Sequence, residues 1–200
     1  MDLESFDQVL KTARSVRRKL DFEREVPLRI VEDCIDVAVQ APVGIGGENW
    51  RFVVVTDSGV KSQLAKTYNE AIAEFASLRS VELKPAQQAL MSRLHEMPCI
   101  ILVCAIGKPG EASNQQTAFY GSILPAAWSL MLALRARNLG ATWTSLLTAR
   151  QLEVGKILGI PMDVTQTVML PVAYTKGAVM KVADRLPARA VTFVNRWGER

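Results

Sequence analysis

One long helix, predicted from Asn114 to Asn138, limits what this chain can fold into. Its middle reads SILPAAWSLMLALRA, so apolar side chains surround the helix axis, and Pro125 lies within the run. Such a helix has no polar face to turn toward water, so it must be buried in a core or pair with another copy of itself. We therefore predict a core helix that also forms much of a dimer interface through Trp128 and Met131.

Two short apolar runs predict the centre of a β-sheet. Phe52–Thr56 and Cys99–Ile106 are rich in β-branched residues and do not alternate with polar ones, which is typical of strands covered on both faces. The other predicted elements are helices near 6–13, 27–41, 62–78, 85–97 and 151–158, an extended segment at 141–148, a strand at 165–174 and a strand-like AVTFV at 190–194. No repeat or linker divides this order, so residues 1–200 are expected to form one α+β domain.

Composition argues against several classes of protein. The chain has 200 residues, of which 49% are hydrophobic and 22% charged, enough to bury a substantial core. Its net charge of +4 is spread along the chain, which does not indicate a nucleic-acid-binding arm and favours a small anion as the basic residues' partner.

Cys34, Cys99 and Cys104 form no CxxC pair and are expected to be core thiols in a reducing compartment. The acidic N-terminus does not resemble a signal peptide, and no apolar stretch approaches the ~20 residues that cross a bilayer, so we expect a cytoplasmic protein without a membrane partner.

The common catalytic motifs do not occur in the sequence. There is no GxGxxG, P-loop or GxSxG pattern. His95 is the only histidine, which argues against a catalytic triad or a zinc site and favours a capping or interface role for this residue. If the protein is an enzyme, we expect its chemistry to come from a bound organic cofactor, with no metal.

Four local motifs follow one another along the chain. The first two are Arg14-Ser15-Val16-Arg17-Arg18, similar to an RRSxR phosphate loop, and APVGIGGENW at 41–50, similar to APSxxNxQPW. The others are LGATWTSL at 139–146, similar to a GLG segment that passes a flavin ring, and Arg185-Leu186-Pro187 near the C-terminus. From about Thr12 to the C-terminus, this set resembles the nitroreductase family of FMN-dependent oxidoreductases.

The resemblance implies a fold, an assembly and a reaction. The fold would be a three-layer α+β domain with a central mixed, mainly antiparallel sheet flanked by helices. The assembly would be an intertwined homodimer with FMN at the subunit interface. The reaction would pass a hydride from NADH or NADPH through flavin N5 to a small nitroaromatic, quinone or enone-like acceptor in a ping-pong sequence. No side chain need act as an acid or base, because flavin N5 carries the chemistry.

The resemblance also implies which residues contact ligands. The phosphate would be held by arginines, whose forked donors make charge-assisted hydrogen bonds to phosphate oxygens. The expected FMN contacts are Arg14, Ser15, Val16, Arg17, Arg18, Pro42, Val43, Gly44, Gly46, Trp143, Thr144, Ser145, Leu146 and Arg185. Either Arg17 or Arg18 could face the phosphate. Phe119 and Tyr120 are expected to contact substrate, although an aromatic pair at a helix start also suits plain packing.

The glycine-bearing loop departs from the family pattern. Val43, Gly46 and Glu48 stand where Ser, Asn and Gln are usual, so side-chain hydrogen bonds to the flavin are lost. Ala13 replaces the first arginine of RRSxR, and Lys19 stands where an aromatic is usual. These changes put FMN affinity in question rather than the fold.

Three interpretations therefore remain open at the level of sequence. The first is the FMN oxidoreductase, and the second is a non-catalytic flavin-binding or sequestering protein with a degenerate site. The third is a structural homologue that binds no flavin. Taken alone, the basic run is equally compatible with a solvated loop, and only the other three motifs favour a phosphate site.

Overall fold

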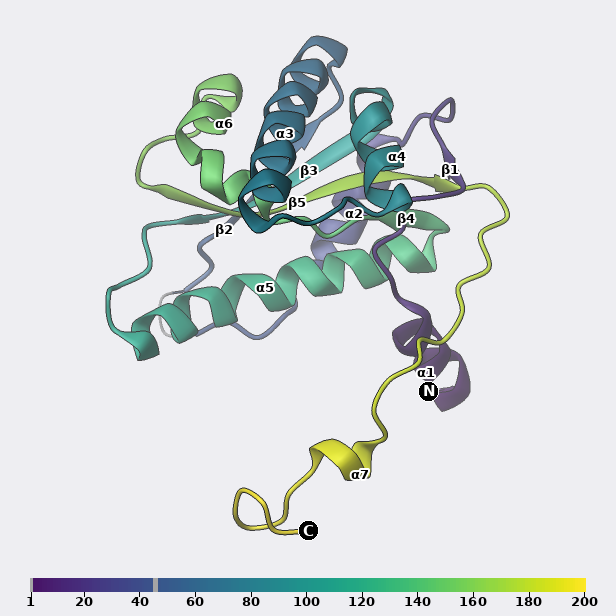
Figure 1. The fold of residues 1–200 in the computed structure, drawn as a ribbon, viewed down its shortest axis with the longest axis vertical. Coiled ribbons are helices and arrows are strands. Elements are labelled where there is room, and N and C mark those ends of the chain that lie inside the picture. The colour runs from purple at the N-terminus through teal and green to yellow at the C-terminus, as the bar shows by residue number, and fades with distance from the viewer. Residues whose placement is uncertain (1, 45–46) are drawn as a thin grey trace.

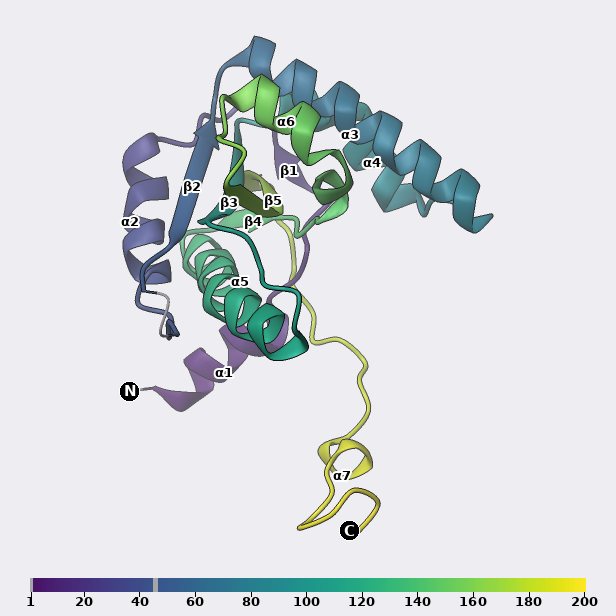
Figure 2. The ribbon, with the colours of Figure 1, turned by 90° about the vertical axis from the view of Figure 1, so that its left-hand side faces the viewer.

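The computed structural model describes residues 2–44 and 47–200. A five-stranded sheet lies between two layers of helices (Figures 1 and 2). In chain order, the elements are α1 (Leu3–Thr12), β1 (Leu20–Asp21), α2 (Leu28–Ala38), β2 (Trp50–Val55), α3 (Ser58–Arg79), α4 (Pro85–Arg93), the 3-10 turn η1 (Leu94–Glu96), β3 (Cys99–Ile106), α5 (Ser113–Ala136), β4 (Leu139–Ala141), the 3-10 turn η2 (Leu146–Arg150), α6 (Gln151–Leu158), β5 (Val164–Thr175) and α7 (Ala188–Val191).

The sheet has the order β1-β5-β3-β2, and β4 also pairs with β5. Every strand pair is antiparallel, and among the described residues a parallel pairing occurs only as an isolated bridge between Gly107 and Val164. The predicted three-layer, mainly antiparallel α+β fold is thereby confirmed.

Successive residues of β3 point into two different cores. Ile101 and Val103 face the layer of α2 and α5, whereas Ile100 and Leu102 face the layer of α3, α4 and α6. All four are at most 3% exposed. A strand covered on both faces needs apolar side chains at every position, which explains why this run does not alternate.

α5 crosses beneath the sheet as the predicted core helix and continues through Pro125. Ile123, Leu130 and Leu134 are fully buried against α2 and the sheet, while Trp128 remains 40% exposed. By length and composition α5 could cross a membrane, contrary to our expectation that no stretch approaches such a span. Its buried side chains give it the surroundings of a core helix.

Two predicted segments were wrong. The AVTFV segment was expected to be strand-like, but its first residues belong to α7, which begins directly after Pro187. Proline there supplies the fixed φ that suits a helix start. The extended segment at 141–148 stops early, because η2 begins at Leu146 after a single bridge between Thr144 and Met169.

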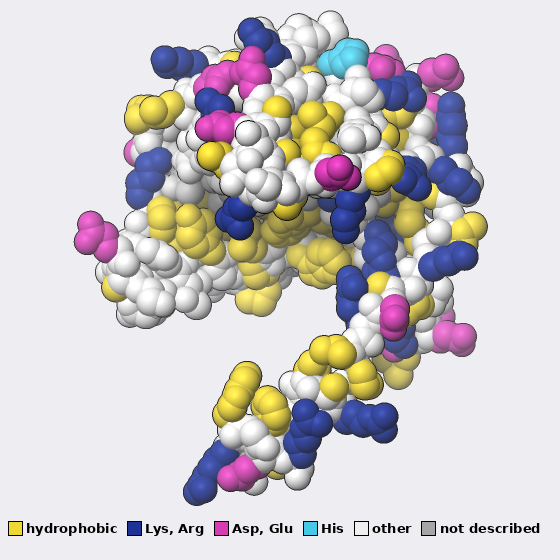
Figure 3. All heavy atoms as spheres, viewed as in Figure 1, with side chains coloured by type: hydrophobic (Ala, Val, Ile, Leu, Met, Phe, Trp, Pro, Cys, Tyr) yellow, Lys and Arg dark blue, Asp and Glu magenta, His cyan; other side chains and the backbone are white. Residues whose placement is uncertain are grey.

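Residues 176–200, here called the C-terminal arm, leave the body of the molecule and extend away from it (Figure 1). Lys176 is tied at the arm's origin by an ion pair to Asp21, 3.1 Å between Nζ and Oδ1. Beyond that point most of the arm's apolar side chains face solvent, including Val179, Leu186 and Trp197. Figure 3 shows hydrophobic side chains gathered on the arm and along the underside of the body.

Candidate functional site

A hollow of about 670 Å³ opens beside the basic loop that follows α1. Four separate parts of the chain meet there, which are the basic loop, α5, the segment after β4 and the C-terminal arm. Its lining residues are Ala13, Arg14, Ser15, Arg17, Trp128, Met131, Trp143 and Arg185. Three of these are arginines and none is acidic, so the hollow suits an anion with a flat apolar body.

The basic loop is fixed to the end of β4 and the two residues after it by three hydrogen bonds. The Val16 N–H donates to the Ala141 carbonyl at 2.9 Å, and the Thr142 hydroxyl donates to the Val16 carbonyl at 2.6 Å. The Trp143 N–H donates to Ser15 Oγ at 3.0 Å. These bonds place Ser15 and Val16 as residues that hold the loop, and the buried Val16 side chain packs into the core.

Gly140 allows this close approach. A Cβ at residue 140 would lie 3.0 Å from Val16 Cβ and 3.1 Å from a methyl carbon of Leu20. Real Cβ atoms rarely come so near a neighbour, so a side chain here would push the basic loop outward. The glycine of the LGATWTSL motif therefore has a packing role next to the hollow.

Arg14 lines the hollow, but its guanidinium is largely engaged with main-chain carbonyls. It donates to the carbonyls of Ala13, of Lys11 at 3.0 Å and of Lys181 at 2.9 Å. The last of these bonds ties the C-terminal arm to the body. Arg14 therefore fixes the arm at the hollow, and fewer of its donors remain for a ligand.

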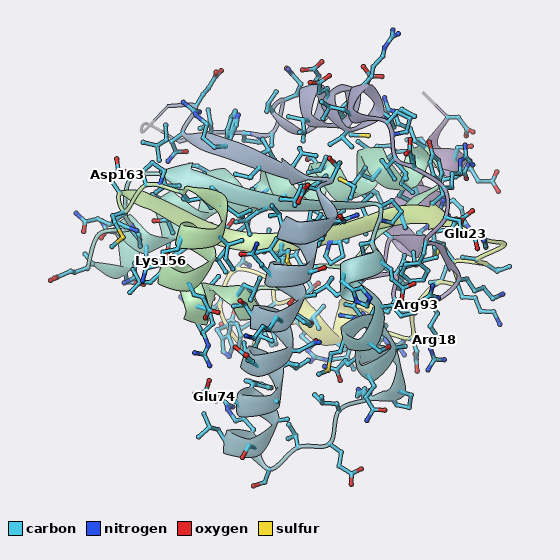
Figure 4. All side chains as sticks on the ribbon, turned by 90° about the horizontal axis from the view of Figure 1, so that it is seen from above. Arg18, Glu23, Glu74, Arg93, Lys156 and Asp163 are labelled. Atoms are coloured by element: carbon cyan, nitrogen blue, oxygen red, sulfur yellow. The ribbon has the colours of Figure 1, made fainter. Side chains whose placement is uncertain are left out.

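Arg17 and Arg18, either of which could face a phosphate by sequence, differ in their relation to the hollow. Arg17 lines the same hollow as Arg185, whereas Arg18 lies outside it. Both Arg17 and Arg18 border a second basic cavity of about 900 Å³ beside the same loop, together with Lys84 and Lys181. Figure 4 shows Arg18 at the same end of the molecule as Arg93 and Glu23.

The segment Trp143–Leu146 only partly faces the hollow. Trp143 borders it, while Thr144 and Ser145 line a narrow slot deeper in the molecule and Leu146 begins η2. The Thr144 N–H donates to the Met169 carbonyl at 3.1 Å, and the Leu146 N–H donates to Thr144 Oγ1 at 3.4 Å. Among the described residues, the Ser145 N–H has no acceptor, which leaves it as the free main-chain donor of this segment.

The glycine-bearing loop lies away from the hollow. Pro42 and Val43 are exposed, and the Gly44 N–H donates to Ser122 Oγ of α5 at 3.0 Å. A Cβ on Gly44 would lie 3.1 Å from that same oxygen, so the close approach that the structure shows is to α5 of the same chain. Gly46 lies outside the described residues, and Trp50, at the end of this motif, is buried in the core.

Phe119 and Tyr120 form an edge-to-face pair with ring centroids 5.4 Å apart. Both are half-buried, and Phe119 packs against the core rather than lining the hollow.

His95 is exposed on η1, with Nε2 4.0 Å from a Glu96 carboxylate oxygen. Within the described part of the chain, no group of three or more His, Cys, Asp or Glu residues could hold a metal.

The three cysteines are buried free thiols, as predicted for core residues. Burial raises the pKa of Cys99 and of Cys104 to about 12. Burial also raises the pKa of Cys34, although the nearby Arg137 opposes the shift. None of them lines the hollow, so they belong to the sheet and helix packing rather than to the site.

Sequence reasoning did not assign Trp128 and Met131 to the hollow, nor Ser122 to the glycine loop. Trp128 and Met131 are three residues apart on α5 and therefore share one helix face, a spacing that could have indicated a common role. Ser122 carries no such signal, because its contact with Gly44 joins segments far apart in sequence.

The chain belongs to the Nitroreductase family, which it matches over residues 10–174. Among characterised relatives, it is 26% identical over 179 residues to the iodotyrosine deiodinase of Drosophila melanogaster, covering 84% of this chain but only 62% of that protein. It is 29% identical over 174 residues to the iodotyrosine deiodinase of Thermotoga neapolitana, covering 82% of this chain and 85% of that protein.

Solved structures share the fold. Iodotyrosine deiodinase bound to FMN and 3-iodo-L-tyrosine superimposes with a TM-score of 0.69 at 23% identity, covering 94% of this chain and 99% of that one. The NADPH:FMN oxidoreductase of Vibrio harveyi complexed with NAD+ gives 0.74 at 16% identity, covering 97% of this chain and 78% of that one. At these identities the likeness establishes the architecture.

Proposed function

We propose that this protein is an FMN-dependent oxidoreductase whose flavin phosphate binds at Arg17 and Arg185. The observation that carries the proposal is the hollow itself, where these two guanidinium groups lie beside Trp143 with no carboxylate in the lining. A phosphate dianion needs converging charge-assisted donors, and arginine supplies them in a forked geometry. When bound there, FMN would supply hydride transfer through its N5 atom, from NADH or NADPH to a nitroaromatic, quinone or enone-like acceptor.

Different residues of the hollow would contact different parts of the bound FMN. Arg17 and Arg185 neutralise the phosphate, and Arg14 holds the arm that carries Arg185. Trp128 and Met131 form an apolar wall that excludes water from one side of the bound ring. Ser15 fixes the main chain of Trp143 and thereby positions the wall on the other side.

Proton transfer by a side chain is not required of this site. The described residues that line the hollow include no histidine, cysteine or acid. Ser145 lies two residues beyond Trp143 and outside the hollow's lining. We assign its free N–H to the polar edge of the ring, because its neighbours Thr144 and Leu146 have their N–H groups engaged. The chain's role is thus to bind and orient donor and acceptor, which occupy the site in turn.

A second copy of the chain completes the proposed site. Pro42, Val43 and Gly44 do not line the hollow of their own chain, yet they are exposed beside α5. The partially exposed Trp128 and the apolar C-terminal arm also need a covering surface. We therefore propose a homodimer in which each glycine loop reaches the partner's flavin, and the protein is expected to act in the cytoplasm on small molecules.

The alternative is a flavin-binding protein without turnover. The observation that favours this alternative is Val43, which is 39% exposed and offers no polar group where the family usually has a serine. The two functions differ in turnover and share the phosphate site.

A spectrum of the purified protein, with mass analysis of any released ligand, tests the cofactor first. Oxidation of NADH and NADPH is then followed with menadione, a nitroaromatic and 3-iodotyrosine as acceptors. Bound FMN with turnover supports the oxidoreductase, and bound FMN without turnover supports the alternative. Failure of the protein to bind added FMN would overturn both.

A further inference from the structure

Ser122 of α5 fixes the glycine loop, residues 41–48 between α2 and β2, to the body of its own chain. The Gly44 N–H donates to Ser122 Oγ at 3.0 Å. The same hydroxyl donates to the Ala118 carbonyl at 3.0 Å, one turn earlier in α5, so its hydrogen is occupied and its lone pairs are left for the loop. Ser122 is only 8% exposed, so the surrounding packing holds this acceptor in place.

The middle of the glycine loop depends on this bond. At its start, Ala41 is hydrogen-bonded to the last residue of α2, and at its end Asn49 is hydrogen-bonded to β3. Among the described residues between these anchors, 42–44 and 47–48, the bond to Ser122 is the one that reaches a helix. Without it, the loop would be held at its two ends and free to move between them.

Glycine at residue 44 permits the contact. A Cβ built there would lie 3.1 Å from Ser122 Oγ, closer than most Cβ atoms come to a neighbour. A side chain would therefore push the loop away from α5 and lengthen the hydrogen bond. Gly44 and Ser122 act as a pair, because each contributes to the same contact.

The pair lies close to one flavin site but does not contact it. Neither Gly44 nor Ser122 lines the hollow of its own chain, and Pro42 and Val43 are exposed. Along the axis of α5, Ser122 is about 9 Å from Trp128, which does line the hollow. One helix therefore forms the wall of its own site and carries the loop that the proposed homodimer presents to the other site.

We propose that Ser122 is a positioning residue that holds Pro42–Gly44 where they contact the partner subunit's flavin. This inference rests on the FMN site and the homodimer of the proposed function. It assigns to Ser122 an effect on the flavin bound by the other chain. A hydroxyl that served only the fold of its own chain would instead affect the flavin in its own hollow.

The rate of FMN release, followed by flavin fluorescence after dilution of the loaded protein, tests the role of the hydroxyl. Ser122→Ala should release FMN about 2- to 10-fold faster than the unchanged protein, as expected for the loss of one hydrogen bond. Ser62→Ala is the matched control, because Ser62 Oγ also donates to a carbonyl four residues earlier in its helix, at 2.8 Å, and should leave the rate unchanged. Gly44→Ala should also speed release, and adding Ser122→Ala to it should change little, because both break the same contact.

Mixed dimers, purified through two different tags, show which flavin responds. In the first, one chain carries Ser122→Ala and the other carries Arg17→Ala and Arg185→Ala, which empty its own hollow. The one bound flavin then meets an unaltered loop and should leave at the rate of the unchanged protein. In the second, all three substitutions lie in one chain and the other is unchanged. Its one flavin then meets the altered loop and should leave about 2- to 10-fold faster.

The outcomes separate this inference from the proposed function. A protein that binds no FMN or stays monomeric would contradict both. A dimer that holds FMN, with Ser122→Ala releasing it at the unchanged rate, would overturn the role of Ser122 alone. Fast release from the first mixed dimer and unchanged release from the second would show that Ser122 acts on the flavin of its own chain, which also overturns the proposal.

Discussion

β5 and the C-terminal arm follow each other in the chain, yet their apolar side chains have opposite surroundings. Leu170 and Val172 of β5 are fully buried, whereas Leu186 is 72% and Trp197 92% exposed on the arm. The two faces of the sheet are therefore buried within one chain, because helices cover both of them. The arm places comparable side chains where only another surface could cover them.

From this difference we infer that β5 contributes to the stability of one chain and that the arm contributes to the proposed homodimer. Substitutions in β5 should change the free energy of unfolding of a single chain. Substitutions on the arm should change association and, through Arg185, ligand binding. The hollow joins the two regions, since Arg17 comes from the body and Arg185 from the arm.

The largest effect is expected in the sheet. Leu170→Ala should lower the free energy of unfolding by about 2–5 kcal/mol, because it leaves a cavity in a fully buried layer. Urea unfolding at low protein concentration measures this change. Leu186→Ala is the matched control on the arm, and an equal loss in both variants would contradict the division between the regions.

The next largest effect is expected in FMN binding at the hollow, where the body and the arm meet. Arg17→Ala and Arg185→Ala should each weaken FMN binding by about 10- to 100-fold, because each removes a charge-assisted donor worth roughly 1.5–3 kcal/mol. Fluorescence titration of the apo-protein with FMN measures the affinity. Arg18→Ala serves as the control, since Arg18 is exposed and outside the hollow. A loss in that control as large as in Arg17→Ala would place the phosphate in the neighbouring basic cavity.

Alkaline pH probes the two buried thiols of β3, Cys99 and Cys104, which have no counterpart on the arm because the arm contains no cysteine. The pKa values of Cys99 and Cys104 rise from 9.0 to about 12 on burial, so the folded state keeps protons that the unfolded state releases. Stability from these thiols is complete below pH 9 and is lost as the pH rises from 9 toward 12, at about 1.4 kcal/mol per pH unit for each thiol.

Cys104→Ala should remove one of these two contributions. The slope of unfolding free energy against pH between 9 and 12 should become shallower by about 1.4 kcal/mol per unit. Urea unfolding at a series of pH values gives the slope. An unchanged slope would mean that the thiol ionises as readily in the folded protein as in the unfolded chain.

The smallest effect on folding is expected at the end of the arm. Trp197→Ala should change the unfolding free energy of the single chain by less than about 0.5 kcal/mol, because the side chain is 92% exposed. Sedimentation velocity should nevertheless show weaker self-association. If dimer formation does not depend on Trp197, the arm's apolar residues are covered by something other than a second copy.

The sequence predicted the elements that bury many side chains. β3, β5 and α5 follow from continuous apolar runs, because burial on two faces requires them. β1 and β4 have only two and three residues, which is too short for a periodic pattern, and they exist because β5 offers them a partner. Local pattern could not reveal pairing between distant segments.

The same limit applies to the site. The motifs identified the loop of Arg14 to Arg18 and Arg185, but which arginines share a hollow depends on the path of the main chain. That path is set by the hydrogen bonds of Ser15 and Val16 to residues more than a hundred positions away. The contact of Gly44 with Ser122 is equally nonlocal, so the sequence left its structural role undetected.

The bond from Arg14 to the Lys181 carbonyl has a consequence for how this chain can evolve. Arg14 holds the arm just ahead of Arg185, so the effect of either arginine depends on the other. If Arg185 binds the phosphate as proposed, its replacement should cost less FMN affinity once Arg14 and its bond to the arm are lost. We therefore expect substitutions at the two positions to be epistatic, so that drift at one relaxes the constraint on the other.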